Sequence, residues 1–371
     1  MAYPHFRLSA FVCFLAACLL TECSTNSVPT RTTATVRKYN GTASVGDFLT
    51  ISIDSAAQTI TYKNYSNGDA GTVPYAVNAD GTYSIADPAG DLLTAYEVPG
   101  YIMVVQTAKS GPDHNTPALL TAVESVPVSI ATFAGRTFNY LQFRTSSGGT
   151  EVGTVTIDAS GNIHHDGYWP FGLLSDPPDP FNGGSFAASS VTEDPSGAFF
   201  TLSESNGSDV VFGTQNGFFA VDTQNGAILG LPKASQKTFD STFAGSYTAI
   251  VYEKPDAQAG PNNTESGTPL EGQAQVVITA AGAVTIRNSQ STLAAGALTP
   301  VADEAYLYDG TANELSDPCY GLFTFRTATA NSQQDVFMSF QNGAVIFSSF
   351  ETALPLQVGN PYTYFYGVGL K

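Results

Sequence analysis

The chain has 371 residues, a charged fraction of only 12% and a formal net charge of −18. It therefore lacks the basic surface that binding to nucleic acid or to anionic lipid requires. The length predicts two or three domains, and the low charge favours an exported, β-rich protein over one with long surface helices.

The N-terminal segment has the layout of an export signal. Arg7 precedes an apolar, uncharged run, "LSAFVCFLAA", at residues 8–17. A short positive region followed by about ten apolar residues is typical of a signal peptide. A spanning helix needs about 20 apolar residues, so this run is too short to cross a membrane.

The end of the apolar run, Leu15-Ala16-Ala17-Cys18, resembles a bacterial lipobox. The resemblance implies that Cys18 receives a diacylglyceryl group and that cleavage follows Ala17. It also implies that the protein attaches through this lipid to the cell envelope, at the outer membrane or the cell surface. Residues 1–17 are then the signal peptide.

Two alternatives to Cys18 stay open. Cys23 is a rival lipid site, although Glu22 stands where the pattern prefers a small residue. The segment can also be an ordinary signal peptide with incidental cysteines. In each case residues 18–38, rich in Ser and Thr, predict a flexible tether. Only Cys319 belongs to the body, which excludes a disulfide framework.

The body reads as a succession of strands and tight turns. Alternating apolar residues with β-branched and aromatic side chains recur in five segments, at residues 48–54, 59–65, 153–158, 275–286 and 335–340. Asn-Gly, Asp-Gly and Ser-Gly pairs separate such segments, as hairpin turns require. The best candidate for a short helix is "PALLTAVESV", residues 117–126.

A self-comparison of the sequence indicates an internal repeat. "TFAGRTFNYLQF" begins at Thr132 and "TFAGSYTAIVYE" at Thr242, and each precedes a similar hairpin, from Val155 and from Val276. A third hairpin, from Tyr75, is a weaker copy. The repeat predicts three β modules, at residues 39–130, 131–240 and 241–371.

The predicted fold is all-β, with tandem antiparallel modules that resemble small barrels or sandwiches. A β-propeller is the alternative, although repetition at the length of a propeller blade is not evident. The terminal stretch "YTYFYGVGLK" is expected to close the last sheet.

One segment, residues 163–184, is the best candidate for a binding site. His164 and Asp166 are two residues apart and would share one face of a strand, where they could hold a metal. Tyr168 and Trp169 could stack on a sugar or a peptide. The alternative is a Pro-rich cap whose aromatic side chains cover the end of a barrel. We predict no catalytic residue, resident metal or cofactor.

These observations predict an exported, lipid-anchored envelope or surface lipoprotein that acts as a non-enzymatic binding or structural module. Its expected partners are the membrane, through the lipid, and an unknown ligand or envelope component, but no nucleic acid. The alternative is a secreted carbohydrate-active or other hydrolase with two carboxylates near residues 163–184.

Overall fold

The structure is a computed structural model of the whole chain. It describes residues 34–86, 92–110, 116–143, 152–169, 179–204, 207–214, 217–235, 238–258, 270–301, 321–328, 333–341, 343–351 and 361–371. Cys18, Cys23 and Cys319 lie outside these ranges, so the lipid site stays a prediction.

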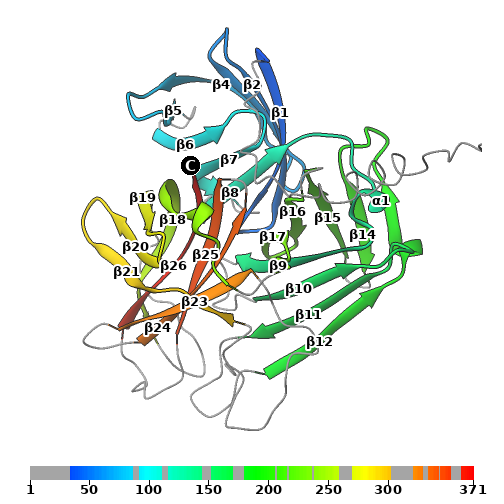
Figure 1. The fold of residues 1–371 in the computed structure, drawn as a ribbon. Helices are drawn as coiled ribbons and strands as arrows, with labels where there is room; N and C mark the ends of the chain where they lie inside the picture. The colour runs from blue at the N-terminus through cyan, green and yellow to red at the C-terminus, as the bar shows by residue number, and fades with distance from the viewer. Residues whose placement is uncertain are drawn as a thin grey trace, which may run out of the picture.

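The first eight strands form a closed antiparallel barrel, drawn in blue and cyan at the top of Figure 1. Each strand pairs with the next, and β8 pairs back to β1. The strands are β1 (Val36–Ala43), β2 (Asp47–Asp54), β3 (Thr59–Asn64), β4 (Ala70–Val77), β5 (Tyr83–Ala86), β6 (Leu92–Val98), β7 (Ile102–Ser110) and β8 (Thr116–Glu124).

A second group of nine strands, called sheet B here, follows in green. Its spatial order is β12-β11-β10-β9-β17-β16-β15-β14-β13. The first strand in the sequence, β9, therefore pairs with the last, β17, in the middle of the sheet. The strands are β9 (Arg136–Phe143), β10 (Val152–Ile157), β11 (Ile163–Trp169), β12 (Asp179–Phe186), β13 (Val191–Glu193), β14 (Phe200–Glu204), β15 (Gly207–Gly213), β16 (Phe219–Thr223) and β17 (Gly226–Pro232).

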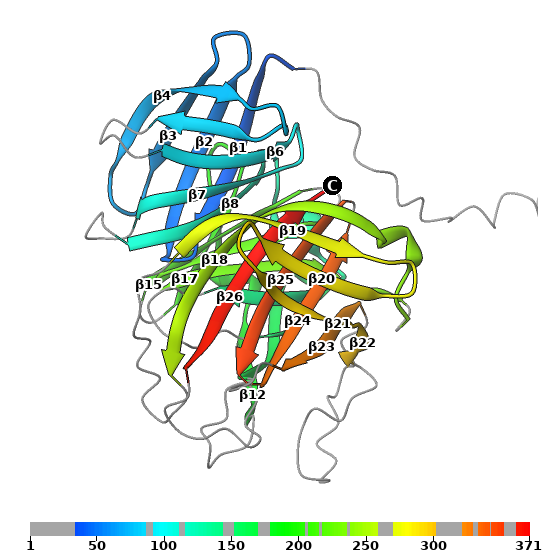
Figure 2. The ribbon, with the colours of Figure 1, turned by 90° about the vertical axis from the view of Figure 1, so that its left-hand side faces the viewer.

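Sheet C, coloured from yellow-green to red in Figure 2, repeats this plan with the order β21-β20-β19-β18-β26-β25-β24-β23-β22. Its strands are β18 (Gly245–Gln258), β19 (Leu270–Ile278), β20 (Ala283–Asn288), β21 (Thr292–Ala297), β22 (Thr299–Pro300), β23 (Leu322–Ala328), β24 (Gln333–Gln341), β25 (Ala344–Glu351) and β26 (Pro361–Leu370). The terminal stretch forms β26, which lies in the middle of the sheet and pairs with β18 on one side and β25 on the other.

Helical structure in the described ranges is limited to short turns. They are α1 (Ile130–Phe133), which precedes sheet B, η1 (Ala188–Ser190) within it, and η2 (Ser241–Phe243), which precedes sheet C. None of the helices described is long and apolar enough to cross a membrane.

The prediction of an all-β fold built from antiparallel, barrel-like modules is confirmed. The alternative of a propeller does not describe this strand order, because a propeller is built from separate four-stranded blades. The barrel spans residues 36–124, sheet B residues 136–232 and sheet C residues 245–370. The modules 39–130, 131–240 and 241–371 stay predictions as domain boundaries.

The expected helix at 117–126 was wrong, because this stretch contains most of β8. Ala118 and Leu120 face the interior of the barrel, whereas Leu119 and Val123 face a core shared by all three sheets. A strand that is buried on both faces has a continuous apolar run instead of alternation, so its period does not identify it.

This shared core holds the three parts of the molecule together. Leu119 and Val123 of the barrel meet Leu141 and Phe143 of β9 and Tyr366 of β26 in one cluster of buried side chains. The rings of Phe143 and Tyr366 stack with centroids 4.7 Å apart. The outer face of the barrel is therefore fixed against both sheets, and the seams between them have defined shapes.

Candidate functional site

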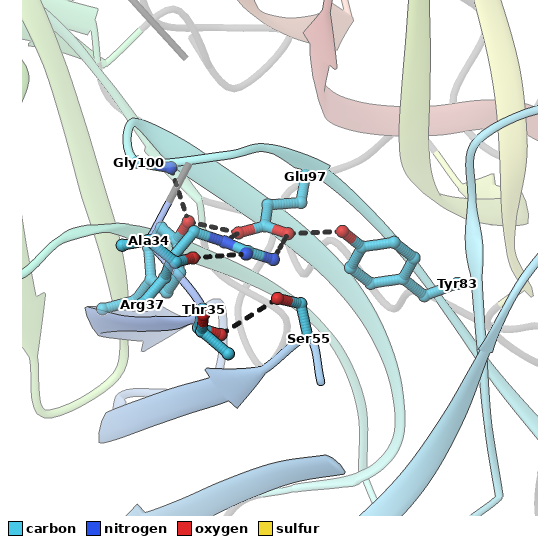
Figure 3. A network of polar contacts seen from close by, with 8 residues as sticks. Ala34, Thr35, Arg37, Ser55, Tyr83, Glu97 and Gly100 are labelled. Atoms are coloured by element: carbon cyan, nitrogen blue, oxygen red, sulfur yellow. Dashed lines mark hydrogen bonds and ion pairs between the residues drawn. The ribbon is translucent and has the colours of Figure 1, made fainter. Parts of the chain in front are cut away.

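The interior of the barrel is filled by its own side chains. Apolar residues from all eight strands form one cluster there, and Tyr39, Tyr75 and Tyr83 belong to it. Near the end at which the chain enters β1, Arg37 and Glu97 join Tyr39 and Tyr83 in a hydrogen-bonded group that we call the Glu97 network (Figure 3).

The other three members of the Glu97 network all donate to the Glu97 carboxylate. Arg37 donates from Nε to Oε1 at 2.6 Å and from Nη2 to Oε2 at 2.7 Å. The hydroxyl of Tyr39 donates to Oε1 and that of Tyr83 to Oε2. Tyr39 in turn accepts from the backbone N–H of Gly100. The Glu97 side chain is fully buried.

The pKa shifts in the Glu97 network follow from this geometry. Burial is the main cause that raises the pKa of Tyr39, and the charge of Glu97 raises it further. Burial and the hydrogen bond to Glu97 raise the pKa of Tyr83, so both phenols stay protonated as donors. With four donors around one carboxylate, the network is complete by itself. We interpret it as a structural network that holds β1, β5 and β6 together at this end of the barrel.

A pocket of about 350 Å³ lies elsewhere, at the seam between the barrel and sheet B. Six of its lining residues come from the barrel and four from β15, β16 and the turn after β16. We call it the Asp222 pocket; it is lined by Val45, Gly46, Asp47, Phe48, Tyr65, Ser66, Ser208, Val210, Asp222 and Gln224.

The turn between β1 and β2 forms one edge of this pocket. Gly46 in the turn has a φ of +87°, and a Cβ atom there would lie 2.5 Å from the carbonyl oxygen of Thr223. Only glycine combines this left-handed conformation with so close a backbone approach. The turn of the barrel therefore packs directly on the β16–β17 turn of sheet B.

Aromatic side chains form the apolar part of the pocket. The ring of Phe48 is buried against Phe199 and Phe212, with centroids 4.9 and 5.6 Å away. Tyr65, at 5.6 Å from Phe48, is 50% exposed, and the Lys63 ammonium lies 4.2 Å from its ring centroid. The rim thus already holds one cation against an aromatic face.

Two carboxyl groups form the polar part of the pocket. Asp47 is buried and accepts from Asn64 Nδ2 at 2.9 Å. Asp222 is only 6% exposed, and its Oδ1 accepts from the Thr42 hydroxyl at 2.6 Å. Burial raises the pKa of Asp222 well above its usual value, and the charges of Asp47 and Asp209 raise it further.

The pocket combines the features of a small-molecule site. It is concave, it lies between two structural units, and it places a few polar groups beside apolar walls. A carboxyl whose pKa is strongly raised by burial and by like charges, next to a pocket, is a further mark of a functional site. The seam therefore has a pocket that two carboxyl groups and several apolar side chains line together.

The predicted site residues lie on β11, whereas the sheet B residues that line the Asp222 pocket lie on β15, β16 and the turn after β16. His164, Asp166, Tyr168 and Trp169 are strand residues, and Asp166 pairs with Thr154 and Asn182 across a register shift. The His164 side chain is exposed, with Nε2 3.8 Å from Asp158 Oδ2. The side chains of residues 165–186 lie outside the description, so a joint site there stays a prediction. Among the described residues no group of three potential ligands could hold a metal.

Sequence reasoning missed both groups of buried carboxyls. A signal existed at Asp222, which interrupts the apolar strand "FFAVDT" and is unusual for a buried position. Glu97 gave a similar signal in "AYEVPG". What could not be seen was the partner of each acid, since Arg37 and Thr42 are 60 and 180 residues away.

Comparisons with known proteins add a low-level likeness of fold. No protein-family model and no curated protein matches the chain. A mutant of Transferrin Binding Protein B from Haemophilus parasuis Hp5 aligns with 87% of this chain and 66% of its own length, at 10% identity and a TM-score of 0.26. This chain thus spans just under two thirds of that protein. A protein with unknown function from Nostoc punctiforme aligns over 66% of this chain and 100% of its own, at 8% identity and a TM-score of 0.23. Such scores assign neither a family nor a ligand to this chain.

Proposed function

We propose that the protein is an exported, lipid-anchored binding protein of the bacterial envelope that holds a small polar ligand in the Asp222 pocket. The observation that carries the proposal is the pocket itself, a chamber between two units with a buried carboxyl in its wall.

The position of the pocket suits a protein that is anchored at its N-terminus. The chain enters the barrel beside the Glu97 network, where Ala34 accepts from Arg37. β1 then runs for eight residues, about 25 Å, to the turn that borders the pocket. A protein tethered through Cys18 would therefore carry the pocket at the far end of β1 from the tether.

Mass spectrometry of the mature N-terminus from a bacterial host tests the anchor. We expect a diacylglyceryl-modified Cys18 as the first residue, and a Cys18→Ala variant that leaves the membrane fraction. A Cys23→Ala variant should remain in that fraction. A soluble product that starts after residue 23 and lacks lipid would contradict the anchor without touching the binding proposal.

A thermal-shift screen with small cations, sugars, amino acids and organic acids tests the pocket. Ser208 is exposed and lines the pocket, so Ser208→Trp should fill it without disturbing the core. Thr192→Trp, at an exposed position of β13, is the matched control. We expect at least one compound to raise the melting temperature of the wild type and of the control but not of Ser208→Trp. If no compound separates the two variants, the pocket is not the binding site.

A hydrolase is the second candidate, and a specific observation favours it. Asp47 and Asp222 line one pocket, and the raised pKa of Asp222 is the property that a general acid needs. Turnover of chromogenic glycosides that disappears in Asp222→Asn would support this candidate. Absence of turnover, together with ligand binding in the thermal-shift screen, would support the binding protein.

A further inference from the structure

We infer that the Asp222 pocket takes a small organic ammonium ion whose charged group contacts Asp47 and Asp222. This inference deepens the proposed binding function and rests on it. It names the class of ligand, which neither the sequence nor the comparisons supply.

The first step is the incomplete bonding of a buried acid. Asp222 is 94% buried and lines the pocket, yet its one hydrogen bond to a described residue comes from the Thr42 hydroxyl, to Oδ1. A carboxylate can accept about four hydrogen bonds. In its ionised form Asp222 therefore needs further donors, which a ligand in the pocket would supply.

The second step is the sign of the surroundings. The charged groups that act on Asp222 are Asp47 from β2 and Asp209 from β15, and both are acidic. Lys63, the cation at the rim, lies against the ring of Tyr65. The potential in the pocket is therefore negative, which favours a cation and disfavours an organic anion.

The third step distinguishes an organic cation from a metal ion. Within the described ranges no three acidic, histidine or cysteine side chains are placed to hold a metal. The pocket also has apolar walls at Val45, Phe48 and Val210 and a volume of about 350 Å³. An ammonium group on a short carbon chain matches both parts, with three N–H donors for the carboxyls and methylene groups for the walls.

Binding of this kind is coupled to proton release. Below its raised pKa the Asp222 carboxyl of the free protein holds a proton; an arriving cation favours the ionised form, so this proton leaves for the solvent. No covalent bond forms or breaks apart from this O–H bond. The affinity should therefore increase as the pH rises toward the raised pKa, and it should level off above that value.

Isothermal titration calorimetry of the purified full-length protein with n-butylammonium tests the inference. 1-Butanol serves as the uncharged probe of similar size, and each titration is run in two buffers with different ionisation enthalpies. We expect butylammonium to bind at least tenfold more tightly than butanol and to release protons. Asp222→Asn, which keeps the shape of the side chain, should weaken butylammonium at least tenfold and abolish the release. Asp80→Asn removes one charge from the distant β4–β5 turn and should change little.

The possible outcomes distinguish failure of the ammonium assignment from failure of the proposed binding function. Equal binding of butylammonium and butanol, or full binding by a folded Asp222→Asn variant, would overturn the ammonium assignment. If the thermal-shift screen finds a neutral or anionic ligand that Ser208→Trp excludes, while butylammonium does not bind, the inference fails and the binding function stands. If no compound distinguishes Ser208→Trp from Thr192→Trp, both fail.

Discussion

The Glu97 network and the Asp222 pocket are two ways of burying a carboxyl group in one molecule. Glu97 receives four donors, two of them from a guanidinium, and every donor belongs to the barrel. Asp222 receives one hydroxyl and faces two further acids. The fold itself supplies the hydrogen-bond donors that the Glu97 carboxylate needs. The Asp222 carboxyl has fewer donors and lies beside a pocket. We interpret the Glu97 network as structural, and the contrast supports our proposal that the Asp222 pocket binds a ligand.

Breaking the Glu97 network should have the largest effect. Glu97→Leu leaves the buried Arg37 without its partner, and such a change costs about 3–5 kcal/mol in the free energy of unfolding. Urea denaturation measures it. The double variant Arg37→Met/Glu97→Leu should recover most of the loss, since no buried charge remains. A cost below about 1 kcal/mol for Glu97→Leu would mean that water reaches the network.

The next effect concerns the seam that forms the pocket. Gly46→Ala combines a strained φ with a contact of 2.5 Å to Thr223, and we expect a loss of about 3 kcal/mol together with loss of ligand binding. Gly68→Ala is the matched control, because its φ of +86° is close to the +87° of Gly46 but no atom lies within 4 Å of the added Cβ. It should cost about 1 kcal/mol and keep the pocket. Equal costs would show that the barrel does not pack on the β16–β17 turn.

Asp222 should also leave a signature in the pH dependence of stability. Its pKa is raised above 3.8 by folding, so between pH 3.8 and the folded pKa the native state holds a proton that the unfolded chain has lost. This contribution is complete below pH 3.8 and is lost as the pH rises through the folded pKa, with a slope of about −1.4 kcal/mol per pH unit. Urea titrations of the wild type minus those of Asp222→Asn should isolate that slope. If the free energy of unfolding of the wild type, relative to Asp222→Asn, increases with pH instead, the pKa of Asp222 is not raised.

The smallest expected effect comes from a second Arg–carboxylate pair, which isolates the role of burial. Arg326 donates to both oxygens of Asp335, at 2.9 and 3.1 Å, but its side chain is 51% exposed. Arg326→Gln should cost about 0.5 kcal/mol, and the cost should decrease in high salt. Chemical denaturation at two salt concentrations measures both. A loss as large as that of Glu97→Leu would show that geometry, and not burial, governs these pairs.

Local patterns predicted much of the fold. The hairpins from Val155 and Val276 are β10–β11 and β19–β20, the second and third strands of their sheets. The hairpin from Tyr75 is β4–β5 and occupies another place in the strand order, so the weakest copy was similar in sequence and different in topology. A tight turn is encoded by a few adjacent residues, whereas strand order depends on pairings over long distances.

The candidate site was harder to predict for the same reason. Aromatic and histidine residues cluster in sequence at 163–184, which drew attention to β11. The Asp222 pocket instead joins the turn at Gly46 to residues about 160–180 positions later, in β15 and β16. Nothing in either segment reveals the other, because packing between units brings them together.

Carbon-13 NMR of protein labelled at its aspartate carboxyls would test the central claim most directly. The resonance that is missing in Asp222→Asn identifies Asp222. We predict that this carboxyl titrates well above pH 3.8 in the free protein and that n-butylammonium lowers its midpoint. A midpoint at or below 3.8, or one that the ammonium ion does not move, would contradict the assignment of the Asp222 pocket as an unfilled cation site.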